Sequence, residues 1–124
     1  MPRLSDKNKT LTERFFEQAF NQGDLSVVDE LLSPKYQYNG HPSPPAGTKA
    51  WVEGLRTQFP GLHFTVEAIL AEDDKVALRW RLDIPKGAAQ PAGSLKGTNI
   101  LTFADGQAVT NDQSGGTMTD FVPA

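Results

Sequence analysis

Few residue types in this sequence could carry out chemistry. The chain has no cysteine, which excludes a thiol nucleophile, a thiolate metal site and a disulfide framework. Only His41 and His63 are histidines, so a metal site of three histidines is excluded, and a His/His/carboxylate site would need both imidazoles to converge. Neither a P-loop nor a dinucleotide-binding glycine pattern is present. We therefore expect any catalysis to use carboxylates, hydroxyls, amides or an imidazole, with no cofactor and no metal.

His41 and Arg79 are two candidates for such chemistry. An imidazole has an ordinary pKa of about 6.5, which suits proton transfer, although a histidine in the proline-rich loop around His41 can equally serve loop packing. Arg79 shares one strand face with Arg81 and Asp83, because side chains two residues apart point the same way. Arg79 could donate to an enolate or a carboxylate; alternatively, this face is solvated or forms a subunit contact. We assign no chemistry to His63.

Asn99 is a candidate of a different kind. It alternates with Leu95, Leu101 and Phe103 along a predicted strand. If those apolar residues face inward, Asn99 is a buried amide, and a buried amide requires a hydrogen-bond partner. That partner is either another part of the protein or an oxygen of a substrate.

The length and charge of the chain limit the number of domains and the kinds of partner that we expect. A chain of 124 residues predicts one domain, residues 1–124. The net charge of −3 gives no basic footprint for nucleic acid. The polar N-terminus and the lack of an apolar run of about 20 residues predict a cytoplasmic protein that does not cross a membrane. A domain of this size covers only part of its apolar surface, so we expect dimerisation to supplement the core.

The first half of the chain is typical of helices. Apolar residues line one face over residues 10–20, with Ser5 or Asp6 as an earlier possible start and Gly23 as the stop. A second, short helix is predicted over residues 24–32 and a third over residues 48–59, each ended by a proline. Between them we expect a short strand at residues 35–39 and an irregular loop at residues 40–47, because three prolines fall within four positions there.

The second half is typical of strands. Alternating apolar residues predict a hairpin over residues 62–70 and 76–84, with Leu62, Phe64, Val66, Ala68 and Leu70 on one face. A third long strand is expected over residues 95–103, and a tight turn at Asp105–Gly106 returns the chain beside it to about residue 113. Helices followed by an antiparallel meander predict an α+β fold.

This order of elements resembles that of the SnoaL-like polyketide cyclases, a branch of the superfamily of nuclear transport factor 2 and ketosteroid isomerase. The resemblance spans nearly the whole chain, including the His41 loop, and is carried by the phrases FEQAFNQGDL (16–25), VDELLSPKY (28–36), FPGLHF (59–64), DKVALRW (74–80) and FADGQ (103–107). It implies a cone-shaped α+β barrel in which three N-terminal helices pack on a strongly curved antiparallel sheet. It further implies an apolar pocket at the open end of the cone.

The family's chemistry is implied by the same resemblance. These cyclases close a ring in a polyketide ester by an intramolecular aldol reaction, using an aspartate of the last strand as acid/base. In this chain that aspartate falls on Gly115 or Gly116, so Asp112 is the nearest replacement. An aspartate has an ordinary pKa of about 3.9 and would need burial to act near neutrality. The alternative is that Asp112 is a solvent-facing carboxylate at a strand end.

Further roles follow from the resemblance. His41 matches a histidine at the pocket mouth and would assist, while Arg79 or Asn99 would stabilise the oxyanion. The residues expected to line the cone and bind substrate are Tyr38, Trp51, Asn99 and Asn111. Tyr36 and Gln113 could also line it, and Trp51 could instead belong to the core.

Two functions remain open, and a third is disfavoured. The first is cofactor-independent proton transfer or ring closure on a polyketide-like or other apolar carbonyl compound. The second is a non-catalytic small-molecule-binding or dimerisation module of the same fold. Epoxide hydrolysis is disfavoured because Arg81 stands where related hydrolases have the aspartate of an Arg-x-Asp pair. In each case we expect a homodimer through the outer sheet face.

Overall fold

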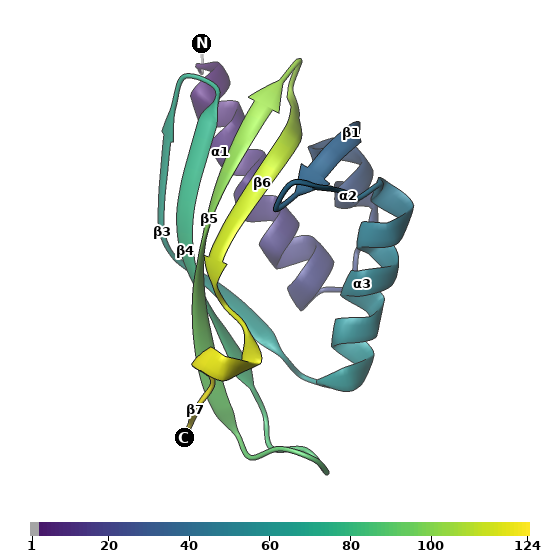
Figure 1. Cartoon of the computed structure of the whole chain (residues 1–124), viewed down its shortest axis with the longest axis vertical. Coiled ribbons are helices and arrows are strands. Elements are labelled where there is room, and N and C mark those ends of the chain that lie inside the picture. Colours follow the sequence, from purple (N-terminus) through teal and green to yellow (C-terminus); the bar gives the residue numbers. More distant parts are fainter. Residues whose placement is uncertain (1–2) are drawn as a thin grey trace.

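A strongly curved sheet wraps around three helices in the computed structural model, which describes residues 3–124 (Figure 1). The helical part comprises α1 (Leu4–Arg14), continued by η1 (Phe15–Asn21), α2 (Ser26–Leu31) and α3 (Pro45–Gln58). The strands are β1 (Leu32–Tyr38), β2 (His41–Pro42), β3 (His63–Glu72), β4 (Lys75–Ile84), β5 (Gly93–Ala104), β6 (Gln107–Gly115) and β7 (Val122–Pro123), with the short helix η2 (Met118–Asp120) before β7. The predicted α+β cone is confirmed.

The strands follow the order β2-β1-β6-β5-β4-β3, and β7 pairs with β5. All neighbours are antiparallel except β1 and β6, which run parallel. The predicted antiparallel meander is confirmed for β3 to β6, and the early strand β1 joins it in parallel to β6. This parallel pairing places Tyr38 of β1 opposite Asn111 of β6, which matters for the site below.

The first helix begins earlier than residue 10. The carboxylate of Asp6 accepts a hydrogen bond from the backbone N–H of Arg3 at 3.3 Å, so the helix starts at Leu4. After Arg14 the helix widens to the π form, with Phe15, Phe16, Ala19 and Phe20 buried. Gly23 ends the turn at φ +75°, a conformation that glycine adopts without strain.

The loop predicted over residues 40–47 is partly wrong. Pro45 to Gly47 form the first turn of α3, and His41–Pro42 form β2. A proline is tolerated at the first helical position because its missing N–H would have no partner inside the helix anyway. The helix therefore starts three residues before the expected Thr48.

A β-bulge interrupts β3, so the alternation predicted for its second half is wrong. The register with β4 shifts between Val66 and Ala68, which adds one residue to β3. One extra residue moves every later side chain to the opposite face. Leu70 is therefore 75% exposed on the outer face, whereas Ile69 packs against the core.

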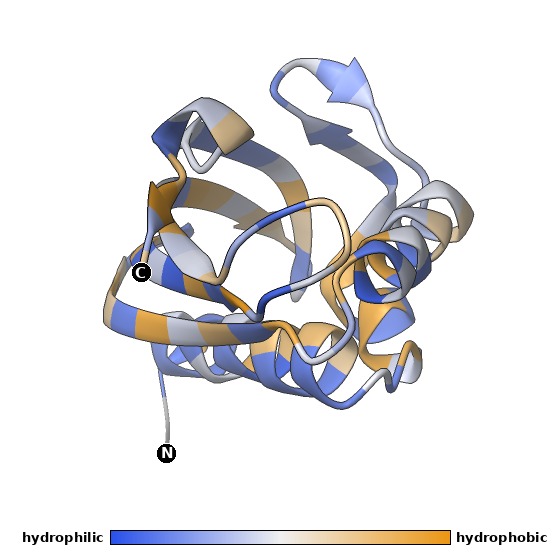
Figure 2. Cartoon of the chain, turned by 90° about the horizontal axis from the view of Figure 1, so that it is seen from below, coloured by the Kyte–Doolittle hydropathy of each residue, from blue (hydrophilic) through white to orange (hydrophobic). Residues whose placement is uncertain are grey.

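The core lies between the concave face of the sheet and the helices. Hydrophobic and hydrophilic residues alternate along the strands in Figure 2. On β4 the inward set is Val76, Leu78, Trp80, Leu82 and Ile84, all buried as the sequence predicts. Within residues 3–124 no helix is both long and apolar enough to span a membrane.

Candidate functional site

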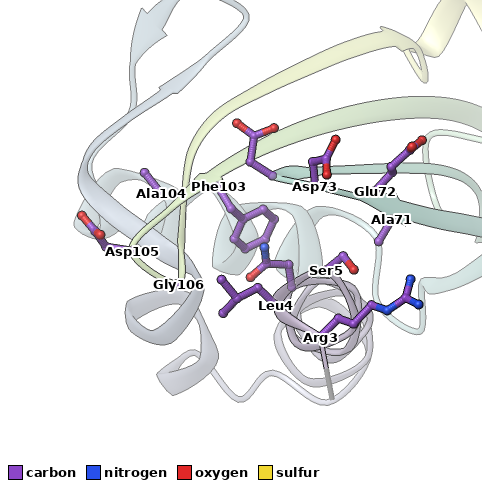
Figure 3. Close-up of a pocket in the computed structure, with 12 residues that line it drawn as sticks. Arg3, Leu4, Ser5, Ala71, Glu72, Asp73, Phe103, Ala104, Asp105 and Gly106 are labelled. Carbon is purple, nitrogen blue, oxygen red and sulfur yellow. The ribbon is translucent and has the colours of Figure 1, made fainter. Parts of the chain in front are cut away.

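Two hollows of similar size lie at different places in the described chain. One, of about 570 Å³, lies between the start of α1 and the turns of the β3–β4 and β5–β6 hairpins. Figure 3 shows Glu72 and Asp73 above Arg3, with Asp105 at another part of the rim. These carboxylates are exposed, and Leu4 beside them is 71% exposed. The hollow is a surface depression with charged residues at its rim, and we assign no ligand to it.

The second hollow is a cavity of about 560 Å³ between the concave sheet, η1 and α3. Its wall is aromatic. Phe20 lies 4.5 Å from Phe64 and 5.5 Å from Trp51 between ring centroids, and Phe64 lies 5.0 Å from Trp80. A cavity of this volume with apolar walls suits a small molecule of drug size.

One end of this cavity is polar, because β1, β5 and β6 bring hydroxyl and amide groups together there. The strand register places Tyr38 beside Asn111, and Asn99 beside Gln113. Tyr36 lies on the same face of β1 as Tyr38, since the two are two residues apart. We call these five residues the polar cluster.

Hydrogen bonds connect the polar cluster to Trp80. The indole Nε1–H of Trp80 donates to Oδ1 of Asn99 at 2.6 Å. Nδ2 of Asn99 donates to Oδ1 of Asn111 at 2.8 Å and to Oε1 of Gln113 at 3.5 Å. The hydroxyl of Tyr38 also donates to Oε1 of Gln113. Asn99, only 3% exposed, thereby has the partners that a buried amide requires.

The two tyrosines are neutral at physiological pH. Burial raises the pKa of Tyr36 to about 12, and a hydrogen bond from Asn111 opposes part of that rise. Burial also raises the pKa of Tyr38. Both hydroxyls therefore keep their protons, and the cavity offers uncharged donors and acceptors.

No charged side chain lines this cavity in the part of the chain that the structure describes. Carboxylates, imidazoles, lysines and arginines all lie elsewhere, and residues 3–124 contain no cluster of acidic and histidine side chains that could hold a metal ion. The cavity can orient a neutral molecule by hydrogen bonds. Its own lining includes no group that would accept a proton near neutral pH.

The structure brings the four predicted binding residues together. Tyr38, Trp51, Asn99 and Asn111 all line the cavity. Trp51, at 53% exposed, lies on α3 with its ring 6.5 Å from that of Tyr38. Trp51 therefore lines the cavity and does not occupy the core position that was its alternative.

The three predicted catalytic residues lie outside the cavity. His41 is exposed on β2. Arg79 points away from the inward residues of β4 and pairs with Glu67 at 3.4 Å on the outer face. Asp112 is exposed and pairs in register with Ile100, itself 49% exposed. The expectation that these groups face the cavity is corrected, because strand alternation turns Arg79 and Asp112 outward.

The sequence reasoning treated Trp80 only as part of an apolar alternation. A buried tryptophan needs a partner for its indole N–H, and Asn99 lies within reach on the adjacent strand. That requirement is the signal that could have linked the two residues. Tyr36, two residues before Tyr38, is marked by the same period of two.

Two glycines, Gly115 and Gly116, stand where the family's aspartate is expected. Gly115 and Gly116 have φ values of +68° and +74°, which favour glycine. A Cβ atom on residue 116 would lie 2.6 Å from two carbons of the Trp80 ring. The indole therefore occupies the space that an acidic side chain on residue 116 would need.

Comparison with known proteins agrees with this fold. The model of the SnoaL-like domain matches residues 12–111. A SnoaL-like polyketide cyclase from Agrobacterium tumefaciens strain C58 is 15% identical, with a TM-score of 0.72 over 97% of this chain and 95% of that one. TsrD from Streptomyces laurentii is 21% identical, with a TM-score of 0.79 over 94% and 91%. AclR from Streptomyces galilaeus, described as a candidate hydroxylase, is 26% identical, with a TM-score of 0.74 over 94% and 92%. No curated protein matches the chain.

Proposed function

The chain belongs to the family of SnoaL-like domains, and we propose that it binds a neutral, largely apolar carbonyl compound in the cavity beside Trp51. The observation that carries this proposal is an aromatic cavity of about 560 Å³ whose one polar end holds no charged group among the described residues. Such a cavity favours a flat, uncharged body with one or two oxygens at one end, because a charged ligand would be desolvated without a counter-charge.

Binding to matched probes tests this proposal. Isothermal titration with 2-acetonaphthone and with 2-naphthoate compares two ligands of one skeleton, neutral and anionic. We expect the neutral ketone to bind at least about tenfold more tightly, because nothing in the cavity offsets the desolvation of a carboxylate. Equal affinity, or no binding of either probe, contradicts the proposal.

A cyclase- or isomerase-type activity is the second candidate, and Tyr36 favours it. A buried, neutral hydroxyl at the polar end is a suitable donor to an oxygen on which negative charge develops. In an intramolecular aldol step, a base removes the α-proton, the enolate carbon attacks a second carbonyl, and the new alkoxide takes up a proton. Because the cavity offers no carboxylate or imidazole of its own among the described residues, water or hydroxide would take the α-proton.

The pH profile distinguishes this activity from binding alone. A cyclase without an internal base gives a rate that rises with hydroxide concentration through neutral pH, with no plateau at the pKa of a carboxylate. The substrate for the assay is 1-phenylhexane-1,3,5-trione, which loses one water when it closes to 5-phenylresorcinol. A rate no higher than in buffer leaves binding as the function.

A second copy of the chain is the partner that we infer for the outer sheet face. The register aligns Leu70 of β3, Ala77 of β4 and Ile100 of β5 in one apolar row across that face. The charges beside the row are partly compensated, because Glu67 lies within 3.4 to 3.5 Å of three cationic side chains, those of Arg79, Arg81 and Lys96, and Asp83 pairs with Arg81 at 3.1 Å. Exposed apolar surface of this kind favours association.

A further inference from the structure

At the polar end of the cavity, Trp80 determines which side-chain atoms donate and which accept the hydrogen bonds. An indole N–H can only donate. Because Nε1 of Trp80 lies 2.6 Å from Oδ1 of Asn99, the oxygen of the Asn99 amide must face the indole and its nitrogen must face the other way. The orientation of an amide is otherwise ambiguous. Here the indole N–H of Trp80, which can only donate, determines the orientation of the Asn99 amide.

The orientation of the Asn99 amide in turn fixes the orientation of the two side-chain amides of β6. Nδ2 of Asn99 donates to Asn111 and Gln113, so both of these side chains turn their oxygens toward Asn99. A second contact agrees for Gln113, whose Nε2 donates to the carbonyl of Gly115 at 3.0 Å. The amide nitrogen of Asn111 therefore faces away from Asn99.

The two tyrosines consequently present opposite groups to the cavity. Tyr36 lines the cavity, and its hydroxyl donates to no other side chain of the described chain, so its hydrogen remains free to donate. The Asn111 amide lowers the pKa of this hydroxyl against the effect of burial. Tyr38 uses its hydrogen on Oε1 of Gln113, so its oxygen remains as an acceptor. One hydroxyl is a donor to the ligand and the other is an acceptor.

We propose that Trp80, acting through Asn99, is a positioning residue that makes the cavity select a hydroxy ketone, with the ligand carbonyl at Tyr36 and the ligand hydroxyl at Tyr38. This inference rests on the proposed binding function and deepens it, because it names the polar groups that the ligand carries. Trp80 is held in place by its neighbours: the ring of Phe64 lies 5.0 Å away, and Gly116 leaves space for the indole.

Three probes that share one naphthalene ring system measure the separate contributions of the ligand carbonyl and the ligand hydroxyl to the affinity. They are 2-ethylnaphthalene, 2-acetonaphthone and 2-hydroxy-1-(2-naphthyl)ethanone, which carry no oxygen, a carbonyl, and a carbonyl with a hydroxyl. With a typical net hydrogen bond of about 1 kcal/mol, each added group should lower Kd by about fivefold in isothermal titration. The measured quantity is the ratio of these Kd values.

Trp80→Phe removes the indole N–H and keeps an aromatic ring. We expect the Kd ratio between the hydrocarbon and the hydroxy ketone to fall from more than about tenfold to less than about threefold. Trp51→Phe is the matched control, because Trp51 lines the same cavity and takes no part in these hydrogen bonds. It should weaken the three probes alike and leave the ratio unchanged.

A spectroscopic readout separates positioning from a merely structural effect. The carbonyl stretch of bound 2-acetonaphthone, labelled with carbon-13, should lie at lower frequency than in hexane because Tyr36 donates to it. Trp80→Phe and Tyr36→Phe should both shift it back toward the value in hexane. Tyr36→Phe retains the whole indole–amide chain and removes only the final donor, so it tests the proposal even if Trp80→Phe folds poorly.

Two results overturn the inference in distinguishable ways. If all three probes bind and the Kd ratio and the carbonyl frequency are unchanged in Tyr36→Phe and in Trp80→Phe, the cavity binds ligands but the fixed orientation of the amides does not select them. If none of the three probes binds the unaltered protein, the proposed function fails, and the inference fails with it.

Discussion

The indole ring of Trp80 packs so closely against Gly116 that a Cβ atom on residue 116 would lie 2.6 Å from two of its carbons. The amide nitrogen of Gln113 would lie 2.7 Å from the same atom. In the family that this chain resembles, the acid/base aspartate is expected at Gly115 or Gly116. Here the packing of Trp80, and its hydrogen bond to Asn99, leave no space for a side chain on residue 116.

Gly116→Ala should destabilise the protein more than Gly106→Ala. Both glycines have positive φ, +74° and +81°, so each alanine bears a backbone cost of about 1 kcal/mol. Residue 106 has open space around its missing Cβ, whereas residue 116 meets the indole. Overpacking should add about 1–3 kcal/mol at residue 116. Urea unfolding of the two variants measures the difference, and equal losses would show that Trp80 moves aside without cost.

Asn99→Leu should destabilise the fold by about 1–3 kcal/mol, because it leaves the buried indole N–H of Trp80 without an acceptor. The same substitution in a Trp80→Phe background should cost less, by about 1 kcal/mol, since no donor is then stranded. The double-mutant cycle is measured by urea denaturation. Additive losses would mean that the hydrogen bond makes no net contribution to stability.

Tyr36 should make the free energy of unfolding fall with rising pH between about 10 and 12. Its pKa is about 12 in the folded chain and 10 when unperturbed, so over this range the unfolded state binds fewer protons than the folded state. Stability from this group is fully present below pH 10 and is lost as pH rises to 12. Between pH 9 and 11 the loss should be about 1 kcal/mol greater in the unaltered protein than in Tyr36→Phe.

Absorbance at 295 nm provides a second measurement of the same property. The chain has two tyrosines, so Tyr38→Phe leaves Tyr36 alone. The remaining phenol should titrate well above pH 10 in the folded protein and near 10 in urea. A folded-state midpoint near 10 would contradict the burial of Tyr36.

The sequence is enough to predict the fold and four of the residues that line the cavity, and too little to predict which strand face several side chains occupy. Alternation on β4 correctly placed Trp80 inward, because that strand has no irregularity. The same alternation predicts the wrong face for Leu70. The β-bulge before it is defined by the pairing of β3 with β4, and the residue types of β3 do not indicate it. The prediction for Asp112 rests on analogy with a family position, whereas strand alternation from the inward Asn111 turns Asp112 to solvent.

Asp112→Asn should leave ligand binding, and any turnover of the trione, unchanged within about twofold. Its carboxylate is exposed and lies in register with Ile100, on the face opposite to the cavity. Asn111→Asp is the informative counterpart, because it keeps the size of the side chain and removes the donor to Tyr36. Titration with 2-acetonaphthone should detect a loss for Asn111→Asp alone. A tenfold loss in Asp112→Asn would restore that residue as a candidate acid/base.

Ile100→Glu should convert a dimer into a monomer. Ile100 is 49% exposed at the β5 end of the row formed with Ala77 and Leu70, so a carboxylate there would be buried without a partner in a face-to-face dimer. Sedimentation velocity at micromolar concentration measures the state. Ala50→Glu, on an exposed part of α3, is the matched control and should remain dimeric. Because the row lies outside the cavity, Ile100→Glu should bind 2-acetonaphthone as the unaltered protein does, and a monomeric unaltered protein would refute the assignment of this face to a second copy.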